Sequence, residues 1–421
     1  MLSPGKLDGL AIAIHIIYYP RVSPNEFRGA PLAGVTVVSL EQAISAPLCT
    51  RHLADLGARV IKIENPKGGD SARHYDRVVH DSMSAHFVWL NHGKESAALD
   101  LTDPDDLTVL IALLEGADVF VSNLAPGALK RLGLAPADLA ERHHRLVVVD
   151  ISGYGVGGPL DHKRAYDMLI QAEGGSCATT GWPGRPAKSG IPLADVGTAL
   201  YAYSSILAAL YHRERTGRGS IIPIAMLDVV AEMMGFALNQ VIHGGIEPQP
   251  VGMGSPMVAP YGAYPTADDQ TVVLGTTSDR EWARLAGLIG RPELAEDPRY
   301  RHNHQRVAGR DVLDDAIAAW TRTLSLADVQ TRADEAGIGN ARLNLVGDLA
   351  VHRQLAERAR WQEVGTPFGQ VPALRHPATG LDWETRPGSV PALGEHTDSI
   401  RAEVATLISS THPVSHAGGD R

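Results

Sequence analysis

Asp195 is the residue whose type and position first suggest chemistry in this sequence. It follows the turn-like segment SGIPLA and begins a long apolar stretch, typical of a helix from about Val196 to Arg213 that ends at TGRG. A carboxylate at a helix start accepts backbone N–H groups and lies at the positive end of the helix dipole, so we expect the pKa of Asp195 to be lowered. From these residues alone two roles stay open, an N-cap that stabilises the helix and an ionised nucleophile.

The segment GYGVGG, from Gly153 to Gly158, matches the GxGxxG pattern of dinucleotide-binding turns. In those turns the last glycine opens an apolar helix whose N-terminus faces the pyrophosphate. Here Pro159 and the polar run LDHKR follow it, and no acidic residue ends a strand about 20 residues further on. The sequence therefore predicts a plain glycine-rich turn and argues against nicotinamide or flavin binding.

Other familiar catalytic and metal-binding signatures are absent from the sequence. It contains no GxxxxGK[ST], HExxH or GxSxG, and its 18 histidines are scattered. The adjacent His143 and His144 fall at an expected helix end, where the dipole favours positive charge. Cys49 and Cys177 form neither a CxxC motif nor a disulfide framework, which fits a reducing compartment. We expect no metal and no permanently bound cofactor.

Composition narrows the class of protein and its partners. The chain has 421 residues, 44% of them hydrophobic and 20% charged, which is typical of a soluble globular protein. Its net charge of −10 leaves no long basic face for a nucleic-acid backbone, so no nucleic-acid partner is expected. The apolar segment from Leu10 to Tyr19 is far shorter than the roughly 20 residues of a spanning helix. We therefore expect no membrane association, a cytoplasmic protein, and an N-terminal extension over residues 1–30.

From Gly34 onward the sequence alternates between apolar strands and helices. Runs rich in β-branched residues predict strands over residues 34–40, 58–64, 118–124, 145–152 and 220–227, and helical spacing predicts helices over 41–57, 105–116 and 127–143. Strands that are apolar throughout and separated by helices are typical of a parallel sheet covered on both faces.

The alternation of strands and helices ends after Met226. A helix to about His243 leads into a stretch rich in glycine and proline, residues 244–269, which we expect to be a loop without secondary structure. A loop of this length is usually functional or a linker. Beyond it the pattern predicts a strand over 271–275, helices over 279–289, 309–323 and 326–336, a helix from about Asp348 through Arg358, and short strands.

Seven segments of the chain, in order from about Pro31 to Ser399, resemble the family III CoA-transferases. This group includes formyl-CoA transferase, carnitine CoA-transferase and the related α-methylacyl-CoA racemases. The matching segments are PLAGVTVVSLEQAISAPLCTRHLADLGARVIKIENPKGGD, LNHGKESAALDL, ADVFVSNLAPGALKRLGL, RLVVVDISGYGVGGP, AYDMLIQAEGG, GIPLADVGTALYAYSSILAALYHRERTGRG and PALGEHTD. Because the match spans most of the chain, it is far more specific than any single motif.

The resemblance implies that Asp195, the aspartate of IPLAD, is the catalytic residue. Its carboxylate attacks an acyl-CoA thioester to give a mixed anhydride, which CoA thiolate converts into an aspartyl-CoA thioester for an incoming acid. The resemblance also implies that Tyr166 and Asp167 line the acyl site and that a mobile glycine loop, here with Gly252 and Gly254, covers it. Without it, the first two are ordinary helix-start residues and the loop is a connector.

Six positions fall where members of the family contact CoA. They are Ala43, Asn65, Leu99, Asn123, Arg131 and Arg164. An arginine suits phosphate geometry, although Arg131 and Arg164 could also be solvated surface charges. Asn65 stands where an arginine is common and Thr102 where some members have a lysine, so the resemblance defines the adenine and 3′-phosphate contacts least.

These features predict a CoA-transferase that moves CoA from an acyl-CoA donor to a small carboxylic acid, for instance from succinyl-CoA to a dicarboxylate. The family's racemases carry a GHD motif for acid and base catalysis, where this chain has Ala165, Tyr166 and Asp167. Tyrosine, with a reference pKa of about 10, suits that task poorly at pH 7. A 2-methylacyl-CoA racemase or epimerase and a catalytically inactive CoA-binding protein remain as alternatives.

The resemblance implies an α/β fold with a Rossmann-like parallel sheet in a large domain and a smaller α/β domain. We expect the large CoA-binding domain over residues 31–225, completed by 348–421, and the small domain with the glycine-rich loop over 226–347. The family's assembly implies an interlocked homodimer, with acyl-CoA and a small acid as its other partners.

Overall fold

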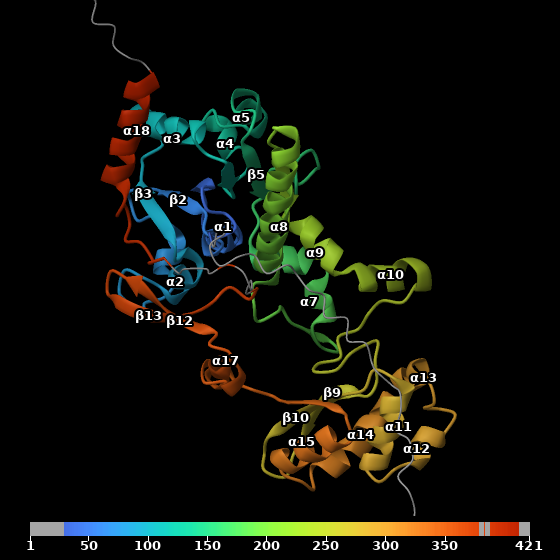
Figure 1. Cartoon of the computed structure of the whole chain (residues 1–421). Helices are drawn as coiled ribbons and strands as arrows, with labels where there is room; N and C mark the ends of the chain where they lie inside the picture. The colour runs from blue at the N-terminus through green and yellow to red at the C-terminus, as the bar shows by residue number, and fades with distance from the viewer. Residues whose placement is uncertain (1–28, 379–382, 384–387, 412–421) are drawn as a thin grey trace, which may run out of the picture.

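A six-stranded parallel sheet forms the centre of the computed structural model, which describes residues 29–378, 383 and 388–411 (Figure 1). The predicted N-terminal extension lies almost entirely outside the described residues. The strands are β1 (Thr36–Leu40), β2 (Arg59–Glu64), β3 (Lys94–Ala98), β4 (Val119–Ser122), β5 (Val147–Ser152) and β8 (Ile221–Ala225). Their order is β3-β2-β1-β4-β5-β8 and every neighbouring pair is parallel, which confirms the predicted parallel sheet.

Two hydrophobic cores cover the two faces of this sheet. Successive strand residues point to opposite faces, so Val37 packs in one core and Val38 in the other. The first core lies under α1 (Ser45–Asp55) and α8 (Leu193–Thr216), and the second under α3 (Pro104–Glu115), α5 (Pro136–Arg142) and α18 (Thr397–Thr411). The apolar strands are therefore buried on both sides, as their sequence predicts.

Strand β3 is the one strand of this sheet that the sequence pattern misses. Its sequence, KESAA, is too polar for an apolar run, yet Lys94 and Ser96 are both buried. Their polar groups contact other buried charged side chains instead of water. A pattern search that looks for hydrophobic residues cannot find such a strand.

Helix α8 is the longest described helix and carries Asp195 in its first turn. It runs for 24 residues and ends at Gly217, which adopts the left-handed conformation common at helix ends. Among the described residues, this helix alone is long and apolar enough to cross a membrane. A core helix has the same properties, and residues such as Ala202 and Ile206 are fully buried in the first core.

Shorter helices surround these elements. They are α2 (Ala85–Asn91), α4 (Ala128–Arg131), α6 (Asp167–Glu173), α7 (Ser176–Thr179), α9 (Met226–Met233), α10 (Gly235–Gly244) and the 3₁₀ helix η1 (Ser71–His74). The single helix predicted after Met226 is broken at Met234 into α9 and α10. A small hairpin of β6 (Gly181–Trp182) and β7 (Arg185–Pro186) precedes α8.

A second unit contains a three-stranded antiparallel sheet with its own core. Its strands are β9 (Tyr261–Pro265), β10 (Thr271–Gly275) and β11 (Gly339–Arg342), and its helices are α11 (Asp279–Leu288), α12 (Glu293–Glu296), α13 (Asn303–Ala308), α14 (Arg310–Thr321) and α15 (Leu326–Glu335). The expectation of a structureless loop over residues 244–269 is therefore wrong at its end. Despite its glycine and its proline, β9 pairs along its whole length with β10.

The chain then returns to the central sheet. The helix predicted from about Asp348 is two short helices, α16 (Val346–Ala350) and α17 (Arg353–Glu357), before the hairpin of β12 (Trp361–Thr366) and β13 (Gly369–Leu374). Past it, the His396 amide donates to the Ser96 carbonyl at 2.9 Å and the Ala98 amide to the Thr397 hydroxyl at 2.9 Å. The return of the chain to β3 supports the predicted division into two domains, which stays a prediction.

Candidate active site

The carboxyl ends of β1 and β4 meet at the point where the strand order reverses. In an open parallel sheet this switch point leaves a crevice that is the usual ligand site. A cleft of about 600 Å³ lies here, lined by the segments that follow β1, β4 and β5 and by the starts of α6 and α8. The predicted residues that line it are Ala43, Asn123, Arg164, Tyr166, Asp167 and Asp195.

A smaller cleft of about 200 Å³ lies beside the first, at the ends of β2 and β3. Predicted CoA contacts Asn65 and Leu99 line it, as does Thr102. The two clefts share Gln42 and Leu124 in their walls, so together they follow the edge of the sheet. Such an elongated site suits an elongated ligand.

Asp167 caps helix α8, a role that the sequence suggests for Asp195. The residue before the helix is Pro192, which offers no side-chain acceptor. Instead, Asp167 Oδ1 accepts the Ala194 amide at 2.9 Å and the Asp195 amide at 3.4 Å, and Asp167 Oδ2 accepts Gln171 Nε2 at 2.7 Å. The N-cap interpretation of Asp195 is therefore wrong, because a carboxylate from α6 occupies the first turn.

The pKa of Asp195 is raised to about 7, not lowered as the sequence predicts. Burial is the larger cause, and the negative charge of Asp167 adds to it. Hydrogen bonds from the Ser45 hydroxyl and backbone N–H lower the pKa but do not offset these two effects. The carboxylate is thus only partly ionised at neutral pH, and it is more basic than an ordinary aspartate.

Ser45 is the first residue of α1 and directly follows the turn after β1 that Asn123 holds in place. Asn123 Oδ1 accepts the Gln42 amide at 2.9 Å, and Asn123 Nδ2 donates to the Gln42 carbonyl at 2.8 Å and to Ser45 Oγ at 3.3 Å. Asn123, predicted as a CoA contact, therefore uses its amide to shape the cleft. Ser45 is a site residue that the sequence analysis missed, since nothing local distinguishes this serine.

The remaining predicted CoA contacts differ in exposure. Arg164 lies exposed at the rim of the cleft and Arg131 is exposed on α4; no hydrogen bond or ion pair joins either guanidinium to another described residue. Leu99 is only 1% exposed and packs in the second core. The Asn65 side chain accepts the Lys67 amide at 2.8 Å, which forms a local turn.

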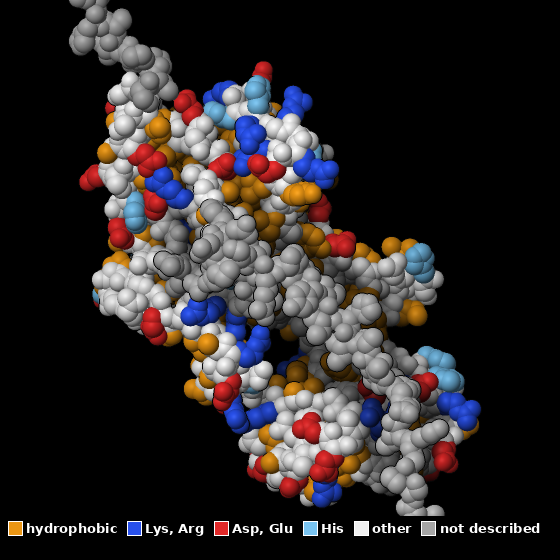
Figure 2. Space-filling view, in the orientation of Figure 1, with side chains coloured by type: hydrophobic (Ala, Val, Ile, Leu, Met, Phe, Trp, Pro, Cys, Tyr) orange, Lys and Arg blue, Asp and Glu red, His pale blue; other side chains and the backbone are white. Residues whose placement is uncertain are grey.

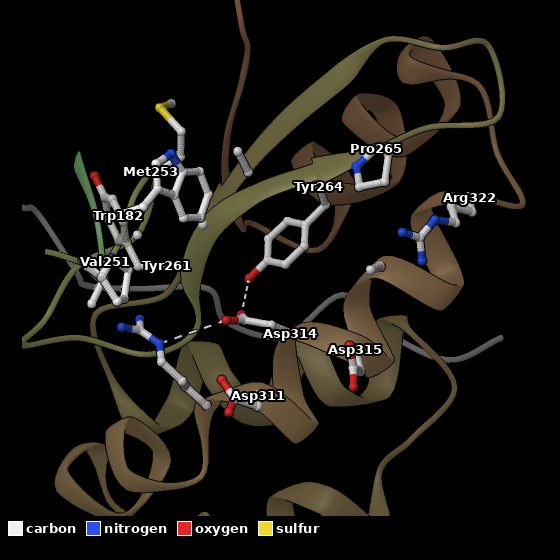
Figure 3. Close-up of a pocket in the computed structure, with 16 residues that line it drawn as sticks. Trp182, Val251, Met253, Tyr261, Tyr264, Pro265, Asp311, Asp314, Asp315 and Arg322 are labelled. Atoms are coloured by element: carbon white, nitrogen blue, oxygen red, sulfur yellow. Dashed lines mark hydrogen bonds and ion pairs between the residues drawn. The ribbon is translucent and has the colours of Figure 1, made fainter. Parts of the chain in front are cut away.

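Gly252 and Gly254 lie away from the cleft that holds Asp195. The Gly252 amide donates to the Gly181 carbonyl at 2.7 Å, and a Cβ at Gly252 would come within 2.5 Å of the Trp182 ring. Gly254 lines a different pocket, of about 460 Å³, between this hairpin and the second unit (Figure 3). Tyr261 also lines that pocket. The described chain does not bring these two glycines together with Asp195, and their lid role stays a prediction.

The GYGVGG segment forms a turn in the wall of the cleft, as predicted. Gly155 and Gly157 have φ of 84° and 88°, which favour glycine. A Cβ at Gly153 would lie 2.1 Å from that of Ala165, so only glycine allows this close approach. Among the described residues, no three His, Cys, Asp or Glu side chains are grouped to hold a metal ion.

Sequence and fold comparisons relate the chain to known proteins. Residues 32–397 match the family described as CoA-transferase family III. Acetyl-CoA:oxalate CoA-transferase of Acetobacter aceti is 35% identical over 89% of this chain and 96% of its own length. Succinate–glutarate CoA-transferase of Agrobacterium fabrum is 31% identical over 93% and 99%. A crystal structure of a CaiB/BaiF family protein from Brucella suis matches with a TM-score of 0.78 and 31% identity, over 89% of this chain and 100% of that one.

Proposed function

The chain belongs to the family III CoA-transferases, which use acyl-CoAs and carboxylic acids as substrates, and we propose that Asp195 is the nucleophile of its reaction. The observation that carries the proposal is the surroundings of this carboxylate. It lines the switch-point cleft, it has a pKa raised to about 7, and Ser45 donates to it from the opposite wall. A basic, oriented carboxylate is the form of aspartate best suited to attack a thioester.

The reaction proceeds through two kinds of covalent intermediate. Asp195 attacks the thioester carbonyl of the donor, the C–S bond breaks, and CoA leaves as the thiolate. The thiolate attacks the aspartyl carbonyl of the resulting anhydride and releases the donor acid, which leaves an aspartyl-CoA thioester. The acceptor carboxylate then attacks this thioester, which forms a second anhydride with Asp195 and expels the CoA thiolate. The thiolate attacks the acceptor's carbonyl carbon in that anhydride, which gives the new acyl-CoA and frees the Asp195 carboxylate.

The neighbours of Asp195 support this sequence in distinct ways. Ser45 supplies two donors to oxygen atoms on which negative charge develops when the aspartyl carbonyl is attacked. Asp167 fixes the start of α8 and so fixes the direction of the Asp195 side chain. Its negative charge also keeps Asp195 basic. Asp195 is partly buried, which limits the access of water that would otherwise hydrolyse the anhydride.

Positive charge and cleft shape support a CoA-binding role for the sheet edge. Arg164 and Lys163 line the main cleft, and the neighbouring cleft with Asn65 and Leu99 extends it. We assign the CoA portion of the substrate to this continuous edge. The guanidinium of Arg131, on α4, is available to a phosphate there.

A dicarboxylate is the acceptor that we favour. The relatives from Acetobacter aceti and Agrobacterium fabrum are named for oxalate and for succinate and glutarate, all dicarboxylic acids. The exposed Arg164 has no partner among the described residues and could pair with a second carboxylate if it does not bind phosphate. Acetyl-CoA and succinyl-CoA are accordingly the donors to test first.

The racemase alternative is less well supported. Tyr166, at the position of the racemase histidine, is 64% exposed beside α6. A tyrosine at this position lacks the imidazole that the GHD motif of the racemases supplies as acid and base. Exchange of the α-proton of a 2-methylacyl-CoA into deuterated water would reveal that activity directly.

We further propose that the protein works as a homodimer. Large apolar side chains are exposed on α10 and just beyond it (Figure 2), and a second set lies around α16. The first set is Phe236, Leu238, Val241, Ile242 and Ile246, and the second is Leu343, Leu345, Val346, Leu349 and Val351. Exposed apolar surface of this extent commonly marks a subunit interface. Light scattering over a range of concentrations tests this, and a monomer at every concentration would contradict it.

Covalent trapping tests the proposed nucleophile. The protein is incubated with succinyl-CoA or acetyl-CoA, treated with hydroxylamine or borohydride, and weighed intact by mass spectrometry. We expect an adduct on the peptide that contains Asp195, and none in Asp195→Asn. The matched control is Asp228→Asn, which changes another first-turn aspartate, on α9, outside the cleft. An adduct that survives in Asp195→Asn, or none in the wild type with any donor, would overturn the assignment.

A further inference from the structure

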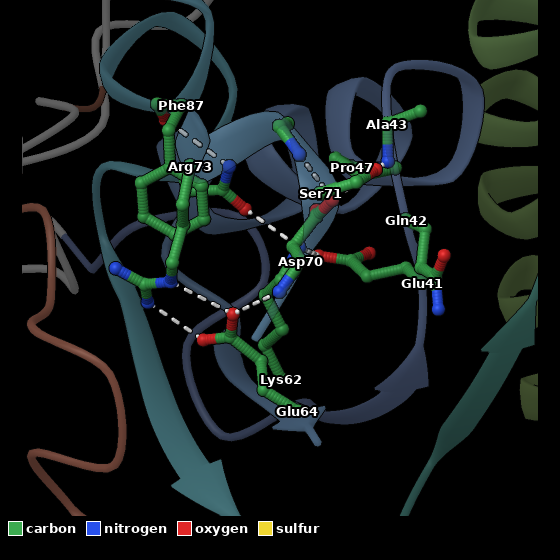
Figure 4. A network of polar contacts seen from close by, with 12 residues as sticks. Glu41, Gln42, Ala43, Pro47, Lys62, Glu64, Asp70, Ser71, Arg73 and Phe87 are labelled. Carbon is green, nitrogen blue, oxygen red and sulfur yellow. Dashed lines mark hydrogen bonds and ion pairs between the residues drawn. The ribbon is translucent and has the colours of Figure 1, made fainter. Parts of the chain in front are cut away.

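A network of buried charges adjoins the smaller cleft, beside the cleft that holds Asp195 (Figure 4). Lys62 and Lys94, on β2 and β3, are buried together with Glu41 and Asp70. Lys62 Nζ lies 2.7 Å from Asp70 Oδ2, and Lys94 Nζ lies 2.6 Å from Glu41 Oε1. Asn91 Oδ1 accepts from both ammonium groups, at 3.1 and 3.0 Å. No charge in this set is left without an opposite one.

One atom of the network contacts the turn that lines the main cleft. Asp70 Oδ1 accepts the backbone amide of Ala43 at 3.0 Å, and the Ala72 amide at 2.9 Å. Ala43 lies in the turn between β1 and α1, two residues before Ser45, and has a φ of 59°. This left-handed conformation is unfavourable for a residue with a Cβ, so the surrounding contacts must hold it.

The Asp70 carboxylate is itself fixed from several sides. Its backbone amide donates to Glu64 Oε2 at 2.9 Å, and Glu64 accepts two hydrogen bonds from Arg73, at 2.9 and 2.7 Å. Lys62 holds the other carboxylate oxygen. These contacts hold the Asp70 carboxylate in one position, and the carboxylate in turn holds the Ala43 amide.

Buried ion pairs contribute little net stability, since desolvation offsets their attraction, and a role in specifying one conformation is their better-supported use. We propose that Asp70, held in place by Lys62, is a positioning residue for the reaction: its carboxylate oxygen fixes the Ala43 amide and so directs Ser45 at Asp195. This inference rests on Asp195 being the nucleophile. Asn123 holds the same turn from the exposed side, and Asp70 holds it from the interior.

The pH profile provides a readout that a purely structural role would not move. The charged or titratable side chains that share the cleft with Asp195 are Asp167 of α6, Lys163, Arg164 and Tyr166 before it, and Tyr75 after η1. Asp167 raises the pKa of Asp195 and Ser45 lowers it. Loss of the Ser45 hydrogen bonds therefore moves the acid limb of kcat to higher pH, while Asp167 and the other groups stay in place.

Two double variants separate positioning from charge. In Lys62→Met/Asp70→Asn the charges go together, and the asparagine oxygen still accepts the Ala43 amide. In Lys62→Met/Asp70→Ala the charges also go, and so does the acceptor. We expect the first to keep kcat within about threefold, and the second to lose at least about tenfold in kcat with little change in the KM for acyl-CoA. The acid limb should move up in the second variant alone.

Equal kcat values and equal acid limbs in the two double variants would overturn the proposal, even if their melting temperatures differed. Should the Asp70→Ala chain not fold, Ser45→Ala tests the end of the same path without touching the ion pair. It should show the same fall in kcat and the same upward shift, and an unmoved acid limb there would also overturn the proposal. Trapping in the wild type is measured first, because failure of that step concerns the nucleophile and not its positioning.

Discussion

Two sets of carboxylates lie at the same edge of the sheet, one buried and one partly exposed in the cleft, and they differ in how they are paired. In the buried set beside the smaller cleft, Glu41, Glu64 and Asp70 each lie within 2.7 Å of a lysine or arginine nitrogen. In the cleft, Asp195 and Asp167 are neighbours, and no ion pair among the described residues includes either of them. The first arrangement gives a fixed geometry, and the second keeps a carboxylate basic at the expense of stability.

The largest effect should follow from breaking the paired set. In Lys62→Met alone, Asp70 stays buried but loses the lysine that pairs with it. Glu41 loses one of the two lysines that pair with it. Removing one partner of a buried pair typically costs about 3–5 kcal/mol of unfolding free energy. Chemical denaturation measures this loss. The matched Lys67→Met, on the exposed loop after β2, should cost almost nothing, and equal losses in the two variants would contradict the comparison.

In the unpaired set, removing a charge should raise the free energy of unfolding instead of lowering it. Because the folded-state pKa of Asp195 is about 7, folding holds a proton that the unfolded chain releases near pH 4, and ionising the folded chain has a cost. Asp195→Asn should remove that cost and stabilise the protein by about 1–4 kcal/mol at pH 8. The gain in melting temperature should grow from pH 4 to pH 7 and then level off. A gain independent of pH would argue against a raised pKa.

Asp167→Asn sharpens the comparison within the cleft. The asparagine oxygen can still accept the Ala194 and Asp195 amides, but the repulsive charge is gone. We expect the pKa of Asp195 to fall, so that the acid limb of kcat moves down by about one pH unit. This shift is opposite to the one expected when Ser45 is removed. A pH profile of kcat with saturating acyl-CoA measures both, and shifts of the same sign would contradict the assignment.

The smallest effect concerns a third buried cluster, formed by side chains of α1 together with His92. His52 and His92 are buried near Arg51 and Asp55, and burial lowers the pKa of each imidazole to about 3. Below about pH 6.5 these two histidines bind protons in the unfolded chain but stay neutral in the folded chain. The free energy of unfolding therefore decreases as the pH falls. His92→Gln should reduce the loss between pH 7.5 and pH 5 by about 1–2 kcal/mol. Thermal melting at the two pH values tests this, with exposed His162→Gln as control.

The sequence predicts the parts of this fold that rest on local patterns. Apolar runs such as VVVDIS identify strands, and the spacing of apolar residues identifies α8. Strand β3 escapes because its buried residues are Lys94 and Ser96, whose partners come from other strands. Strand β9 was missed because its pairing with β10 outweighs the local preference of its one glycine and one proline for a loop.

The sequence predicted which residues line the candidate site better than it predicted the pKa of Asp195 and the contacts around it. Asp195, Asp167 and Tyr166 do line one cleft, as the family resemblance implies. The direction of the Asp195 pKa depends on burial and on Asp167, 28 residues away, which no local pattern reports. Ser45 and Asp70 were missed for the same reason, because their roles appear only when the turn after β1 is folded.

The contact between the end of the chain and β3 has a consequence for biosynthesis. The side chains and amides that cover the free edge of β3 come from Gly394, His396 and Thr397, which lie 298 to 300 residues later in the sequence. At about 5–20 residues per second, a ribosome needs roughly 15–60 s to supply them. During that interval the edge can pair with another nascent chain, and an uncovered strand edge favours aggregation. Slower initiation or lower temperature should therefore raise the soluble yield more than any change in the cleft.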